Sequence, residues 1–144
     1  MDWKNKILNP KGWLIAFGVL FLLAGANNYF AAEKSSETAY PEDSTDRDVF
    51  YEQTFGLFTM SLAALTLTTG LFVTGRELSI LAMVSSGATM MFLSLHYIAG
   101  EAVDYGYNDP AVLGVVLTLT ATLGVSGFLH LNDEEAEGAP AAEA

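Results

Sequence analysis

Cysteine is absent from this 144-residue chain, and its absence removes several kinds of chemistry. Without a thiol there can be no disulfide, no thiolate metal ligand, no redox-active cysteine and no palmitoylation. Basic residues are also scarce: six lysines and arginines stand against seventeen acids, which gives a net charge of −11. An acidic chain repels phosphate backbones, so we expect no nucleic-acid partner, whereas cations or a basic partner would be attracted. The acidic proteome of a salt-adapted organism would explain the same charge.

Charged residues are missing from four long stretches, 12–32, 53–75, 78–100 and 110–131. Each runs for about 20 residues, the length that a helix needs to cross a hydrocarbon core of about 30 Å. The sequence therefore predicts an all-α integral membrane protein, an antiparallel bundle of four transmembrane helices. Residues 1–131 would form its one domain. The tail, 132–144, is acidic and rich in Ala, Pro and Gly, which is typical of disorder.

The connections between these stretches differ in length. The second and third stretches are separated only by Arg76 and Glu77, which predicts a tight antiparallel hairpin. The first loop, Glu33–Phe50, is rich in acids, Ser, Thr and Pro, and is expected to hold at most a short surface helix. Before the fourth stretch, Asp109 followed by Pro110 predicts a helix cap and a first-turn proline.

Orientation follows from the few basic residues. Four of them, Lys4, Lys6, Lys11 and Arg76, fall on one side of the predicted membrane, and two, Lys34 and Arg47, fall on the other. The positive-inside rule then places both termini in the cytoplasm and the chain in the cell membrane. A second interpretation of the first stretch is a cleaved signal peptide, because an apolar run there precedes Ala24-Gly25-Ala26. Against it, the apolar run continues through residues 29–32.

Small and polar residues recur along the predicted helices. In lipid, helices pack through small residues that let their backbones approach closely. In the second stretch the spacing of Glu52, Gly56, Thr59, Ala63, Thr66 and Gly70 forms a heptad seam. We predict helix packing at Gly18, Gly25, Gly56, Ala63, Gly70 and Gly114. The third stretch offers a stripe of Ser85, Thr89, His96 and Gly100, and the fourth repeats Gly114, Thr118, Thr122, Ser126 and His130 at every fourth position.

The candidate site is a polar cluster predicted near the external ends of the helices, made of Asn28, Glu52, His96 and Glu101. Ionisable groups at membrane depth are costly and usually face a partner or the bundle interior. A carboxylate and an imidazole there could relay a proton, bind a ligand or, with Glu101, hold a divalent cation. The competing interpretation makes Glu52 a solvated first-turn residue and His96 an interfacial one. The spacings match no cofactor, nucleotide or catalytic-triad motif, so no cofactor is expected.

The layout resembles the DoxX-like group of small four-helix membrane proteins. The resemblance is carried by the entry to the second stretch, Tyr51-Glu52-Gln53-Thr54-Phe55-Gly56-Leu57-Phe58, by the Gly75-Arg76-Glu77 turn and by the first stretch, rich in Gly and Leu. It implies a four-helix fold and, for some members, a link to sulfur or quinone redox systems. It matches no catalytic residue of this chain, and the long acidic first loop departs from it.

The favoured function is therefore non-enzymatic: a structural or accessory protein of the lipid bilayer, as a subunit of a membrane complex or as a homo-oligomer. One alternative is a small-molecule or ion carrier, or a channel component, that uses Glu52 and His96. A second alternative is an accessory subunit of a quinone-linked redox system.

Overall fold

The computed structural model describes residues 3–133, and every regular element in that range is a helix. The helices are α1 (Trp3–Ile7), α2 (Pro10–Phe30), α3 (Ala32–Ala39), α4 (Asp46–Phe72), α5 (Gly75–Glu101) and α6 (Pro110–Leu129). Four candidate spans, Asn5–Phe30, α4, α5 and α6, are long and apolar enough to cross a membrane. The prediction of an all-helical chain with four long apolar segments is confirmed. Most of the predicted tail, 134–144, lies outside the described residues.

Helix starts are set by capping residues. Asn9 precedes Pro10 and accepts from the Lys11 backbone N–H at 2.9 Å, and Asp109 likewise caps α6 by accepting from Ala111 N–H at 2.7 Å. The cap predicted at Asp109 and Pro110 is therefore confirmed. These side chains satisfy backbone donors that have no partner within their helices.

Helix α4 begins at Asp46, seven residues before the charge-free stretch from which we predicted its span. Thr45 is its N-cap, and the Thr45 backbone N–H donates to Asp48 at 3.0 Å. Carboxylates are favourable in the first turn of a helix, where the backbone leaves a partial positive charge. A helix boundary predicted from the absence of charge therefore leaves out the charged first turns of α4.

The loop between α2 and α4 contains α3, which has one face of small residues. Its buried residues are Ala32, Ser35, Ser36 and Ala39. This spacing places them on one side of the helix, and α3 packs against α4. Glu33 and Glu37 on the other side are exposed.

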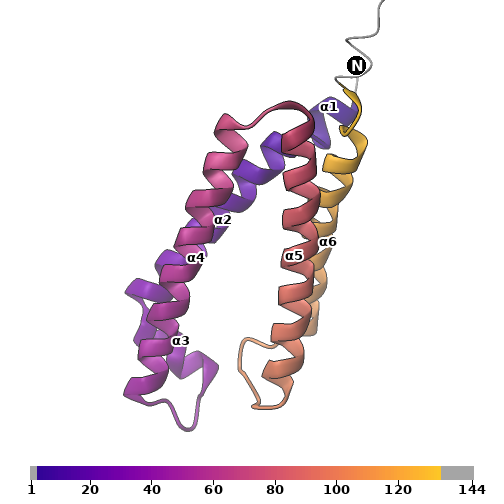
Figure 1. Cartoon of the computed structure of the whole chain (residues 1–144). Helices are drawn as coiled ribbons and strands as arrows, with labels where there is room; N and C mark the ends of the chain where they lie inside the picture. The colour runs from indigo at the N-terminus through magenta and orange to yellow at the C-terminus, as the bar shows by residue number, and fades with distance from the viewer. Residues whose placement is uncertain (1–2, 134–144) are drawn as a thin grey trace, which may run out of the picture.

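The long helices form two pairs, α2 with α4 and α5 with α6 (Figure 1). Gly18 meets Leu67 and Gly25 meets Gly56, so positions that rise along α2 meet positions that fall along α4. The tight packing predicted for the second and third stretches is not found. Although the chain turns within Val73–Thr74, α4 and α5 diverge from that turn and make little contact with each other.

The two pairs meet in an apolar core near that turn. Leu14 and Phe17 of α2 pack there with residues of the other pair, Leu78, Ala82 and Leu123. We call this the turn end of the molecule, which holds α1 and Val73–Thr74. The opposite end holds α3 and the loop 102–109 and is called the α3 end (Figure 1).

Candidate functional site

Glu52 is the centre of a polar cluster at the α3 end. It lies on α4 with 5% of its surface exposed. The Asn28 side-chain amide of α2 donates to one carboxylate oxygen at 3.0 Å, and the Tyr105 hydroxyl donates to the other at 3.1 Å. One buried carboxylate thus joins α2, α4 and the loop 102–109, and both of its oxygens have a partner. Hydrogen bonds to a charged group are among the stronger ones in proteins.

Tyr105 connects this carboxylate to other aromatic rings. Its ring lies 5.7 Å from that of Tyr40 and 5.5 Å from that of His96, both edge-on. Burial raises the pKa of Tyr105, and the neighbouring Glu52 raises it further, because both disfavour a phenolate. The pKa of Tyr40 is raised by burial and then by Asp48 and Glu52. Tyr105 is therefore held as a neutral hydroxyl that can donate to Glu52.

His96 lies next to Tyr105, which bonds to Glu52. Its imidazole stacks on Phe55 of α4 at 6.2 Å and on Phe92 of α5 at 5.7 Å, while the residue as a whole is exposed. Within the described range no hydrogen bond or ion pair joins Glu52 and His96. Asn28, Glu52 and His96 are thus brought to one end, with Tyr105 placed between the last two.

Glu101, the fourth predicted member, lies apart from this cluster. Asn108 donates to the Glu101 carboxylate at 2.8 Å and to the Tyr97 carbonyl at 2.9 Å. Glu101 lines a separate cavity of about 230 Å³ with Gly100, Asp104, Tyr105 and Asn108. Among residues 3–133 no group of three or more His, Asp or Glu side chains could hold a metal ion. Of the three possibilities raised for the cluster, a divalent cation is therefore the one that these described side chains do not support.

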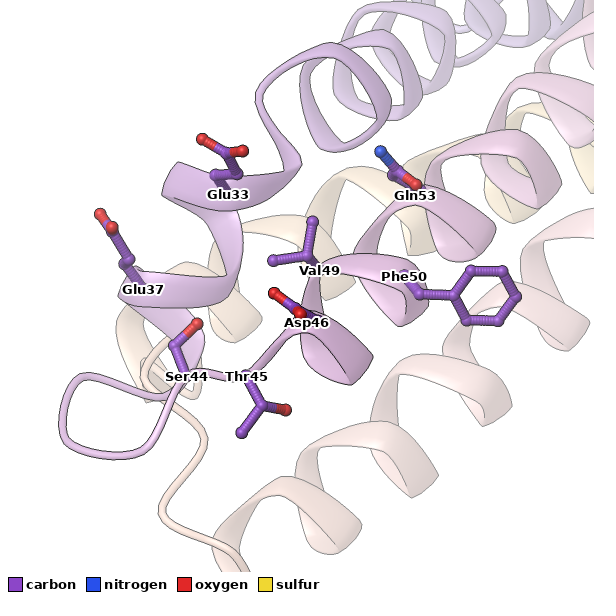
Figure 2. Close-up of a pocket in the computed structure, with 8 residues that line it drawn as sticks. All are labelled: Glu33, Glu37, Ser44, Thr45, Asp46, Val49, Phe50 and Gln53. Carbon is purple, nitrogen blue, oxygen red and sulfur yellow. The ribbon is translucent and has the colours of Figure 1, made fainter.

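A larger cavity of about 360 Å³ lies between α3 and the start of α4 (Figure 2). Its lining includes three carboxylates, Glu33, Glu37 and Asp46, together with Val49 and Phe50. In Figure 2, Glu33 and Glu37 extend from α3, whereas Val49 and Phe50 extend from α4. Three of the six acids of the first loop thus line this cavity.

At the turn end, His130 follows α6 and is largely buried. Its Nδ1 lies 2.6 Å from an Asp133 carboxylate oxygen, and its Nε2 is buried without a hydrogen-bond partner. Both residues line a cavity of about 320 Å³ with Lys11 and Ser79 among its other residues. The sequence pattern placed His130 on the stripe of the fourth stretch but gave no sign of this pairing.

The predicted packing residues divide between the two helix pairs. Gly18, Gly25, Gly56, Ala63 and Gly70 are all buried, and the four glycines lie where α2 meets α4. Gly114 is placed differently: it is exposed, and a Cβ added there would meet nothing within 4 Å. A repeat of four residues drifts by about 40° per step, so Gly114 and the buried Ser126 are about 120° apart around α6.

Sequence analysis missed Tyr105, the residue that completes the cluster. Its signal was weak, because a tyrosine in a polar loop gives no indication of which helix it will reach. Chemically, a buried carboxylate, a neutral phenol and an exposed imidazole form a line from the interior of the α3 end to its surface. The hydrogen bond between Glu52 and Tyr105 can hold segments together, whereas Tyr105 and His96 meet through their rings.

Comparison of this chain with family models, with curated proteins and with solved structures finds no match. The resemblance to the DoxX-like group thus rests on the sequence pattern alone. Nothing that it implies is carried over to Glu52 or its neighbours.

Proposed function

We propose that this chain is an integral membrane protein whose four long helices form an antiparallel bundle with both termini in the cytoplasm. Support comes from the four apolar helices and from the opposite order of contacts along α2 and α4. The orientation is supported by the basic residues Lys4, Lys6, Lys11 and Arg76 near the turn end.

Single cysteines test this orientation, because the chain has no native thiol. Glu37 of α3 and Val103 of the loop 102–109 are both exposed, so cysteines there should be reachable. In intact cells an impermeant thiol reagent is expected to label Glu37→Cys and Val103→Cys but not Ala142→Cys. Labelling of Ala142→Cys alone would mean that the orientation is the opposite of the one proposed.

Within the membrane, the proposed role is that of a structural or accessory protein that works with other membrane subunits or with copies of itself. The observation that carries this role is the bonding of Glu52, whose two oxygens are engaged by Asn28 and Tyr105 of the same chain. The buried charge is used to fix three segments in place. Large apolar side chains on all four long helices, such as Leu23, Phe58, Ile98 and Phe128, remain exposed for lipid or for partner helices.

Substitutions at Glu52 test whether its two hydrogen bonds stabilise the fold, which we call its bracing role, or whether the carboxylate serves only a chemical role. Glu52→Ala leaves the Asn28 and Tyr105 donors without their acceptor, so the free energy of unfolding should fall by about 1–3 kcal/mol. Glu52→Gln keeps one acceptor oxygen and should lose less. Titration with a denaturing detergent measures both values, and equal stability of both variants and the native chain would contradict a bracing role.

The partner is tested by gentle purification. After extraction in mild detergent, the chain is expected to migrate well above the size of its 15.4 kDa monomer and its detergent belt. Mass spectrometry of that fraction then distinguishes a homo-oligomer from a complex with defined stoichiometry. A monodisperse monomer at every detergent-to-lipid ratio would count against the accessory role.

A second candidate function, an ion or proton carrier, is favoured by the line from Glu52 through Tyr105 to His96. Its test is proton flux into liposomes that contain the purified chain and a trapped pH dye. Flux that is lost in Glu52→Gln and Tyr105→Phe but kept in Tyr107→Phe would support a carrier. No flux above that of empty liposomes would leave the structural role alone.

A further inference from the structure

The contacts between the two helix pairs are concentrated at opposite ends of the molecule. At the turn end, Leu14 and Phe17 of one pair share a core with Leu78, Ala82 and Leu123 of the other. Along their length α4 and α5 make little contact with each other, and Figure 1 shows their ribbons moving apart from the turn. The pairs are thus joined firmly at one end.

At the α3 end Phe55 of α4 stacks on His96 of α5 at 6.2 Å, and the loop 102–109 adds three further contacts between the pairs. The Gly106 backbone N–H donates to the Ala39 carbonyl at 2.9 Å, and the Tyr105 hydroxyl donates to Glu52 at 3.1 Å. The Tyr105 ring also lies edge-on to Tyr40 at 5.7 Å. All three contacts come from two neighbouring residues of one short loop.

Gly106 fits this contact because it has no side chain. A Cβ added there would overlap the Thr38 carbonyl oxygen, a backbone atom at the end of α3. Any larger residue must therefore push the loop away from α3. The loop and α3 meet backbone to backbone, without the deep interdigitation of apolar side chains found at the turn end.

We propose that residues 105–106 act as a releasable clasp and that the turn-end core acts as the hinge about which the two helix pairs separate. Release of the clasp opens the α3 end between α4 and α5 and uncovers Glu52, which Tyr105 contacts in the closed form. The device is a property of the fold and stands independently of the accessory role proposed above. Hinge motions of this kind need few contacts between the moving bodies away from the hinge.

Spin labels report the opening directly, in the full chain reconstituted in lipid nanodiscs. Cysteines at the exposed positions Tyr51 and Leu95 measure the α3 end, and cysteines at Leu71 and Ile80 measure the turn end. In Gly106→Ala and Tyr105→Phe, the distance between the α3-end labels is expected to lengthen. The distance between the turn-end labels should stay as in the native chain.

Matched controls keep the test specific. Gly114→Ala adds a methyl group where nothing lies within 4 Å, and Tyr107→Phe removes a hydroxyl from an exposed ring of the same loop. Neither should change either distance. If Gly106→Ala fails to reach native helicity, Tyr105→Phe alone decides the result through the same two distances.

Two outcomes would overturn the proposal. Unchanged α3-end distances in the folded clasp variants would mean that other contacts hold the pairs together. Equal lengthening at both ends would mean that the pairs loosen as a whole and that no hinge exists. As a second measure, labelling of Glu52 by a hydrophobic carbodiimide should rise at least several-fold in the clasp variants and stay at the native level in the controls.

Discussion

The α2–α4 pair and the α5–α6 pair achieve close contact by different means. In the first pair glycines face each other: a Cβ on Gly25 would lie 2.7 Å from the Gly56 carbonyl oxygen, and one on Gly56 would lie 2.6 Å from that of Gly25. In the second pair the glycines belong to α6 alone, and Gly124 and Gly127 meet the serines and Ala82 of α5. In the first pair the glycines of both helices meet backbone, whereas in the second pair Gly127 meets one backbone oxygen, that of Ser79, and otherwise both glycines of α6 meet side chains.

The difference shows how tolerant each interface is. A contact between two backbones cannot adjust, because a carbonyl group in a helix cannot rotate away. A contact with a serine hydroxyl can adjust by a change of rotamer. We therefore expect the α2–α4 pair to be the more sensitive to added volume.

The largest effect is predicted for Gly56→Leu. Overpacking usually costs about 1–3 kcal/mol. Here the nearest atoms to an added Cβ are all backbone atoms, those of Gly25 and Tyr29, so the loss should reach the top of that range or exceed it. Leu57→Phe is the control, because Leu57 is exposed. Titration with a denaturing detergent measures the free energy of unfolding of both variants. Equal losses would mean that the contact between Gly25 and Gly56 is no more sensitive to added volume than an exposed position.

A smaller loss is predicted for Gly127→Leu in the other pair. A Cβ there would lie 2.5 Å from the Ser79 carbonyl oxygen, but its other neighbours are the side chains of Met83 and Ala82. The expected cost is within about 1–3 kcal/mol. Gly114→Leu on the open face of α6 should change stability much less. If Gly127→Leu lowers stability more than Gly56→Leu, then the α5–α6 pair is the more sensitive of the two to added volume.

A pH-dependent effect is predicted where the two pairs meet at the α3 end. The pKa of Tyr105 is raised in the folded chain from an ordinary value of 10.0, chiefly by burial. Its stabilising contribution is then fully present below pH 10 and is lost as the pH rises above that value, because the unfolded chain ionises first.

Thermal unfolding of the native chain and of Tyr105→Phe between pH 8 and 11 measures this loss. The stability advantage of the native chain should shrink above about pH 10. Tyr40, whose pKa is also raised, is present in both proteins, so the difference between them reports the change made at Tyr105. A constant difference across the range would show that Tyr105 titrates alike in both states.

The smallest effect is predicted for Ser86→Ala. The Ser86 hydroxyl of α5 donates to the Thr120 carbonyl of α6 at 2.7 Å and lies beside Gly124. Side-chain hydrogen bonds between membrane helices average about 0.6 kcal/mol, so a loss of that order is expected. Ser94→Ala is the control, because Ser94 bonds only within its own helix. A loss above that for Gly127→Leu would mean that hydrogen bonding, more than close packing, holds this pair.

The number of long apolar helices and the packing face of α4 could be predicted because their signals are strong. Absence of charge over the length of a span marks a membrane helix, and the spacing of Gly56, Ala63 and Gly70 repeats every seven residues. That spacing keeps small residues on one side of the helix. In the structure all three residues are buried.

The packing faces of α5 and α6 were harder to predict. In α5 the predicted stripe contained Ser85 and Thr89, while the residues buried against α6 include Ser79, Ala82 and Ser86. One residue of shift is a rotation of about 100°, and an almost uniformly apolar helix offers no polar face to fix that rotation. Likewise, the pairing of helices and the reach of Tyr105 depend on contacts between distant segments, which spacing within one segment does not encode.

The pairing of helices also has a consequence for biosynthesis. Each tight pair is made of long helices that follow each other in the chain, with only the short α3 and its flanking loops between α2 and α4. The first pair can therefore form once residue 72 has been synthesised, before the second pair has been made. Because α4 makes few contacts with α5, the packing of α2 against α4 does not depend on α5. We therefore expect the α2–α4 pair to reach its final packing during translation, and the α5–α6 pair to pack against it afterwards.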